Sequence, residues 1–245
     1  MDGWVVGRTL VVASGLTFLV GMLVAAVPFY AGKPVDLKRA VLSNLASPGI
    51  NPRGHLIADG AVLLCGLMLV PVAVWLCRCF CEFHRGMSRS GTALLLAGLA
   101  GVLAIGASGP YVNGFSLVHI YLAYATFIFA ALGMLVLLGL ATRWELRRSS
   151  GRGLLAMSVV KGAVVVFLLW LLAGQWRDTG QHFFDCSTLL RSLAFCEWVI
   201  CAECFVCLWV LAKAAARMQS AVYLVAAERP YASTSTTMWL RRSGR

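Results

Sequence analysis

Charged residues are scarce in this sequence. They make up 13% of the 245 residues, whereas about a quarter of an ordinary soluble domain is charged. Hydrophobic residues make up 60% of the chain, and apolar runs long enough to cross a hydrocarbon layer of about 30 Å recur along most of it. A water-soluble single domain is therefore excluded, and we expect an integral, multi-pass membrane protein.

Acidic residues are rarer than basic ones. Ten Asp and Glu stand against twenty-one Lys and Arg, which gives a formal net charge of +11 at pH 7. In a nucleic-acid-binding protein such an excess gathers on one folded face. Here the basic residues fall mostly between apolar runs, which is the pattern that sets membrane topology. We therefore expect no nucleic-acid partner.

Several short motifs that carry chemistry are missing. No glycine-rich loop ends in Gly-Lys-Ser or Gly-Lys-Thr, and no HExxH or HxxxH pair supplies two metal ligands from one helix. No Asn-x-Ser/Thr sequon indicates a compartment. The chain also lacks a convincing internal repeat, which is the mark of inverted-repeat transporters. We expect neither a metal nor a cofactor.

Six segments are long and apolar enough to cross a membrane, and each should be a helix because unpaired backbone groups find no water in lipid. The expected fold class is all-α, a six-transmembrane-helix bundle. The spans are about 8–30, 56–76, 91–108, 115–141, 154–174 and 189–212, and residues 31–55 form an outer cap loop. The transmembrane domain would thus cover 1–212. Residues 213–245 would be a basic cytoplasmic tail, either disordered or anchored at the interface through Trp239 and neighbouring arginines.

The basic residues predict the orientation of the spans. The N-terminus, second loop, fourth loop and tail carry one, three, four and six Lys or Arg, fourteen in all, against six on the opposite side. The positive-inside rule then places both termini in the cytoplasm. The first, third and fifth loops would face outward.

Small residues are concentrated in the third span. Gly98, Gly101 and Gly106 run through it, within the stretch Ala-Gly-Leu-Ala-Gly-Val-Leu-Ala. Small residues allow helices to approach closely in a membrane. We expect this span to be central and closely packed.

Ionisable residues inside spans are functional candidates because their burial in lipid is costly. His55, Asp59, His119 and Glu197 would lie at similar depth near the outer surface. One interpretation is a catalytic or metal site, where an activated water attacks a lipid ester or amide. The interpretation that we favour is a buried hydrogen-bond network joining spans two, four and six.

Lys161 and Glu203 would lie at matching depths in the cytoplasmic half of the fifth and sixth spans. An isolated Lys there costs about 2.5 to 3.5 kcal/mol on insertion scales. We expect a structural ion pair between the two. The alternatives are a Lys161 side chain that reaches to the inner interface and a small-solute transporter that uses both residues.

The nine cysteines fall mainly into two groups. Cys77, Cys79 and Cys81 lie where the second span meets the cytoplasm, a position suited to S-palmitoylation. Inert interfacial thiols are the alternative. The second group lies within the sixth span, and we interpret its members as small packing residues: Cys196, Cys201, Cys204 and Cys207.

Motifs in the first outer loop point to a family. Ser43-Asn44 is followed by Pro48-Gly49 and Pro52 just before the second span, and His119 stands at the outer start of the fourth. With six spans and both ends inside, this pattern resembles the damage-regulated autophagy modulator and FRAG-type superfamily, and equally the related bacterial six-span membrane family of unknown function. The resemblance implies a six-helix bundle linked to lipid remodelling, plasma-membrane lipid regulation or autophagy, mostly without an established catalytic residue.

These features predict a non-catalytic integral membrane protein that binds membrane lipid or a partner membrane protein. It would act as a subunit or regulator in a membrane complex, or as a homo-oligomer. A membrane-embedded lipid-modifying enzyme and a small-solute transporter are the alternatives. Convergence of the outer polar side chains on an open, water-accessible site would favour the enzyme, whereas a filled interior would argue against both alternatives.

Overall fold

The computed structural model describes residues 3–32, 42–108, 117–147, 152–176 and 193–240. All regular structure in these ranges is helical. Six helices are long and apolar enough to cross a membrane, which confirms an all-α, multi-pass membrane protein. The helices are α1 (Gly3–Tyr30), α2 (Leu42–Leu45), α3 (His55–Cys81), α4 (Arg85–Ser108), α5 (Leu117–Leu146), α6 (Arg152–Trp176) and α7 (Leu193–Leu240).

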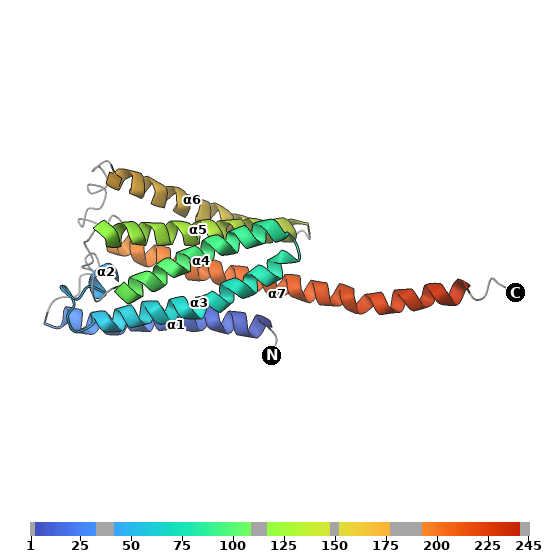
Figure 1. Ribbon diagram of the computed structural model, residues 1–245, viewed down its shortest axis with the longest axis horizontal. Coiled ribbons are helices and arrows are strands. Elements are labelled where there is room, and N and C mark those ends of the chain that lie inside the picture. The colour runs from blue at the N-terminus through green and yellow to red at the C-terminus, as the bar shows by residue number, and fades with distance from the viewer. Residues whose placement is uncertain (1–2, 33–41, 109–116, 148–151, 177–192, 241–245) are drawn as a thin grey trace.

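The long helices form one bundle (Figure 1). α1, α3, α4, α5 and α6 pack in this order, each against the next, and α7 packs against α1, α3 and α5. The short helix α2 covers one end of the bundle, and both ends of the chain lie toward the other end. An even number of spans requires this arrangement of the termini.

Glycine allows the close approach of α4 and α5. A Cβ atom added at Gly98 would lie 2.6 Å from the backbone N of Ala130, and one at Gly133 would lie 2.4 Å from the backbone N of Leu95. No side chain fits at such distances, so the two backbones nearly touch. The small-residue span is thus packed between α3 and α5, as its composition predicts.

Several helices extend beyond the apolar segments from which the spans were predicted. α3 continues to Cys81, α4 begins at Arg85 and α5 continues to Leu146. Hydropathy marks only the part of a helix that lies in lipid, whereas Arg, Ala and Leu favour helix on either side of that boundary. The second and fourth loops are correspondingly shorter than expected.

The largest difference concerns the predicted boundary at residue 212 and the tail beyond it. α7 does not end there but runs to Leu240. Ala214, Ala215 and Met218 are buried in the main core cluster, because the Ala-rich sequence after Lys213 continues both the helix and its packing face. The beginning of the predicted tail therefore belongs to the bundle.

Candidate functional site

A cavity of about 180 Å³ lies inside the bundle, between α1, α3, α4, α5 and α7. Its walls are almost entirely apolar, and among the described residues that line it Glu197 is the one acidic or basic side chain. Leu99 and Met134 line it from α4 and α5 and are buried from the outside. Apolar cavities of about 150 Å³ stay dry and accept ligands as large as benzene. This interior can therefore hold a segment of an apolar chain.

A second hollow, of about 510 Å³, lies between α1 and α7 on the outside of the bundle. Leu16 and Leu19 of α1 line this groove and are about half exposed, at 56% and 45%. In a membrane such side chains face lipid. The groove is therefore open to the acyl chains of the bilayer.

The groove and the cavity share one wall. Phe18, Cys201 and Phe205 line both hollows. The rings of Phe18 and Phe205 contact each other, with centroids 5.8 Å apart and an angle of 45° between their planes. Two aromatic side chains and a thiol thus separate the cavity from the groove that faces the bilayer.

Glu197 connects the cap around α2 to this cavity. Its Oε2 accepts a hydrogen bond of 2.7 Å from the backbone N of Leu42, at the start of α2. The first N–H groups of a helix have no partner within the helix, so the carboxylate satisfies one of them. The cap and α7 are thereby joined at the cavity wall.

Asn51 also holds the cap around α2 against the bundle. It is 1% exposed, and its Nδ2 donates to the backbone O of Ala25 and of Leu45, both at 2.9 Å. Its Oδ1 accepts from the backbone N of Gly54 at 3.1 Å. In the sequence, Asn51 stands before Pro52, a pair that is typical of turns. Its role as a cross-link between α1, α2 and the start of α3 depends on contacts that no local pattern encodes.

The predicted outer polar network is not joined by hydrogen bonds within the described residues. His55 Nδ1 lies 3.2 Å from the backbone O of Asn51, and Glu197 bonds Leu42 instead. His119 lies in α5, but its side chain is outside the described residues, so its expected contact with Asp59 stays a prediction. No group of three or more His, Cys, Asp or Glu side chains in the described part of the chain could hold a metal ion.

Asp59 differs from the other described residues of the predicted polar network. It is 4% exposed, and neither of its carboxylate oxygens has a hydrogen-bond partner among the residues that the structure describes. A buried polar group without a partner costs free energy, and a buried charge costs more. This site therefore suits an uncharged side chain of the same shape.

We expect Asp59→Asn to leave the free energy of unfolding unchanged within about 1 kcal/mol, or to raise it, because the amide removes an unpaired acidic group without changing the volume. The measurement is thermal or denaturant unfolding of the purified protein in detergent. Thr92→Val is a matched control, because Thr92 Oγ1 on α4 is also buried and has no partner in the described part of the chain. A loss of more than about 2 kcal/mol on Asp59→Asn alone would show that the carboxylate is needed in its charged form.

The structure brings Lys161 and Glu203 together between α6 and α7. Lys161 is fully buried, and its Nζ donates to Glu203 Oε2 and lies 3.6 Å from Cys204 Sγ. Glu203 Oε1 is buried without a hydrogen-bond partner among the described residues. The pair links α6, which packs mainly against α5, to α7.

A second ion pair joins α5 to α7. Arg217 Nη1 donates to Glu145 Oε1 at 3.1 Å, and Glu145 is 3% exposed. Sequence reasoning missed this pair because residue 217 was assigned to the tail. A lone acid among the basic residues of the fourth loop was the signal that could have indicated it.

The three cysteines at the end of α3 have different surroundings. Cys79 is buried in the main core cluster. Cys77 and Cys81 are half-buried, with Sγ atoms 3.8 Å apart, and Ser88 Oγ donates to the backbone O of Cys77 at 2.9 Å. Palmitoylation stays a prediction, and Cys77 and Cys81 offer the more accessible thiols. On α7, Cys207 is fully buried, as a packing residue would be.

Comparison with known proteins gives one match. A family model described as Protein of unknown function (DUF998) matches residues 11–216. The matched range includes the second to fifth spans and most of the first and sixth, and it ends beyond the predicted boundary at 212. It agrees with the resemblance to a six-span family of unknown function, whereas the relation to the damage-regulated autophagy modulators stays a prediction. The sequence has no match among curated proteins or among solved structures.

Proposed function

We propose that this chain, which belongs to the DUF998 family of proteins of unknown function, is a non-catalytic membrane protein that binds the apolar chain of a lipid inside its helix bundle. The observation that carries the proposal is the wall that the groove and the cavity share. Phe18, Cys201 and Phe205 line both the apolar cavity and the groove that is open to the bilayer.

Physical chemistry favours occupation of the cavity. Lipid tails are as apolar as the helix side chains, so the gain on entry is dispersion contact and not a classical hydrophobic term. Atoms that line an empty cavity lack partners on one side and forfeit part of that attraction. A chain end that enters past Phe18 and Phe205 would restore it. With about 180 Å³, the cavity holds only part of a chain, and the rest would lie in the groove.

Photo-crosslinking in nanodiscs tests the proposal. The probe is phosphatidylcholine with a diazirine in its acyl chain, and adducts are mapped by mass spectrometry. We expect adducts on Leu99 or Met134, which line the cavity and are 5% and 2% exposed. Adducts confined to bilayer-facing residues such as Leu16 would contradict lipid entry.

A cavity-filling variant sharpens this test. Cys201→Phe adds a ring at the shared wall and should reduce the Leu99 and Met134 adducts at least fivefold. Val199→Phe is the matched control, because Val199 is on the same helix, is 47% exposed and lines neither hollow. The control should leave the adducts unchanged. The melting temperature of both variants shows whether the bundle is intact.

The alternative functions have less geometric support in the described residues. The enzyme needs His55, Asp59 and Glu197 to converge, yet His55 approaches Asn51 and Glu197 bonds Leu42. The transporter needs Lys161 and Glu203 to face a pathway, yet Lys161 is fully buried between helices. Of the expected functions, we therefore propose the binding of membrane lipid.

The proposal includes an orientation. By sequence, fourteen of the twenty-one Lys and Arg fall in the N-terminal segment, the second and fourth loops and the tail, which an even number of spans puts at one end. By the positive-inside rule this end would face the cytoplasm. The cap formed around α2 would then cover the outer end, and the shared wall would open toward the bilayer below it.

A further inference from the structure

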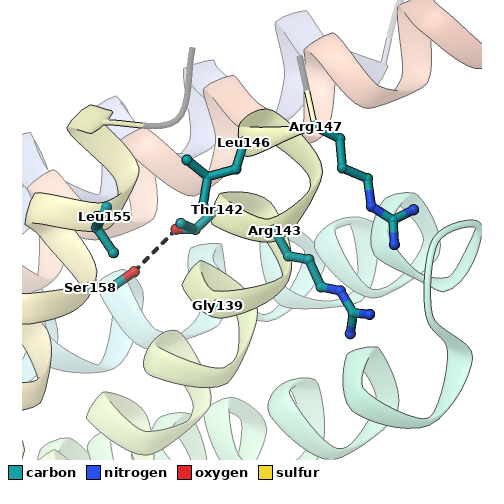
Figure 2. A pocket seen from close by; sticks show the side chains of 7 residues that line it. All are labelled: Gly139, Thr142, Arg143, Leu146, Arg147, Leu155 and Ser158. Carbon is teal, nitrogen blue, oxygen red and sulfur yellow. Dashed lines mark hydrogen bonds between the residues drawn. The ribbon is translucent and has the colours of Figure 1, made fainter. Parts of the chain in front are cut away.

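A third hollow lies at the opposite end of the bundle from the cap, where α5 ends and α6 begins. It measures about 490 Å³ and is lined by Gly139, Thr142, Arg143, Leu146, Arg147, Leu155 and Ser158. Figure 2 shows Thr142 of α5 and Ser158 of α6 facing each other, whereas the side chains of Arg143 and Arg147 both point away from Ser158. The hollow thus has a cationic side and an apolar side.

The cationic side is available to a ligand. Arg143 lies in the last turn of α5, Arg147 directly follows the end of that helix, and both are exposed. Neither has a carboxylate partner in the described part of the chain, and Arg147 lies over the ring of Phe83 with its Cζ 5.3 Å from the centroid. By contrast, Arg217 at the same end is already paired with Glu145. Two unpaired guanidinium groups at adjacent positions suit an anion such as a phosphate.

The apolar side is equally open. Leu146 and Leu155 are 52% and 50% exposed, and a Cβ added at Gly139 would meet no atom within 4 Å. The floor between the helices is closed by the hydrogen bond of 3.2 Å between Thr142 Oγ1 and Ser158 Oγ. Ser158 Oγ also donates to the backbone O of Leu154 at 2.9 Å. These hydroxyl groups are satisfied, so the hollow offers apolar contact beside two cations.

We infer that this hollow binds an anionic phospholipid, with the phosphate on Arg143 and Arg147 and the upper part of an acyl chain along Gly139, Leu146 and Leu155. The candidate span of α5 ends at Leu146, which would put the site at the depth of the lipid headgroups. A free phosphate would use the arginines but would leave the apolar side uncovered. The inference rests on a different part of the molecule from the interior cavity and does not depend on it.

Lipid titration of the full-length protein, stripped of lipid in a neutral detergent, tests the inference. We expect phosphatidylglycerol to bind and raise the melting temperature more than phosphatidylcholine does. Arg143→Gln with Arg147→Gln should weaken the binding of phosphatidylglycerol about 30-fold, at roughly fivefold for each charge. Native mass spectrometry gives the dissociation constants.

The matched control removes the same charge at the same end of the bundle. Arg85 and Arg89 are exposed, lie one turn apart on α4 and do not line the hollow. Arg85→Gln with Arg89→Gln should change the binding less than threefold. Equal losses in the two double variants would show diffuse attraction to a basic surface and would overturn the site.

A steric variant tests the apolar side. Gly139→Phe places a ring in the open space of the hollow and should reduce phosphatidylglycerol binding at least tenfold. Gly162→Phe on α6 is its control, because a Cβ at Gly162 also meets nothing within 4 Å and this residue lies outside the hollow. If Gly139→Phe leaves binding unchanged, or if inorganic phosphate competes with the lipid at equal concentration, the lipid site is excluded in favour of a bare anion site or none.

Discussion

Lys161→Met is expected to lower the free energy of unfolding by about 3 to 5 kcal/mol. Lys161 is fully buried, and its Nζ is bound to Glu203 Oε2. Met has a similar length and fills the same space, so little packing is lost. The loss comes from Glu203, which is only 12% exposed and would keep a charge without a counter-ion. Unfolding in detergent, followed by circular dichroism, measures it.

A double variant distinguishes the effect of the broken ion pair from the effect of lost side-chain packing. Lys161→Met with Glu203→Gln removes both charges, so it should recover most of the loss. Lys213→Met is the control, because Lys213 is exposed on α7 and makes a ring contact, with its Nζ 4.8 Å from the centroid of Trp209, but no ion pair within the described residues. That change should cost no more than about 1 kcal/mol. A double variant as damaged as the sum of the single variants would mean that the two residues act separately.

Gly133→Ala is expected to destabilise the bundle by about 3 kcal/mol, the upper part of the range for overpacked cores. The new Cβ would lie 2.4 Å from the backbone N of Leu95 and 2.7 Å from the backbone O of Gly91. These are backbone atoms, so no side chain can move aside, and α4 and α5 must separate. The melting temperature in detergent reports the loss.

The same helix provides the matched control. Gly139→Ala places its Cβ where no atom lies within 4 Å. Because Ala favours helix more than Gly, this change should be neutral or stabilising by up to about 1 kcal/mol. Equal effects of the two substitutions would show that helix propensity, and not the contact between α4 and α5, decides stability here.

Hydropathy predicted the number and type of the spans because lipid leaves the backbone no alternative to helix. Depth along the helices matched Lys161 with Glu203, and their side chains meet in the structure. Such arithmetic works because a helix rises by a fixed distance per residue. It places residues along the bundle axis and says nothing about which helices are neighbours.

The features that the sequence did not predict depend on which helices are neighbours and on how each is rotated about its axis. Glu197 was placed with Asp59 on depth alone, yet its rotation on α7 directs it to Leu42. The interior cavity is formed by five helices and the α2 segment, and no single one of them encodes it. The arginines of the α5–α6 hollow were counted only for their sign, although their place beside an apolar hollow distinguishes them from a pair such as Arg85 and Arg89.

The ion pair between α6 and α7 also affects how strongly the membrane potential acts on these two helices. A single charge that crosses the whole bilayer gains or loses about 2.3 kcal/mol per 100 mV. Lys161 and Glu203 lie together and carry no net charge as a pair, so the electric field exerts almost no net force on them. As long as the pair is intact, the packing of α6 on α7 is insensitive to voltage. Separation of the two side chains would expose each helix to a force of opposite sign.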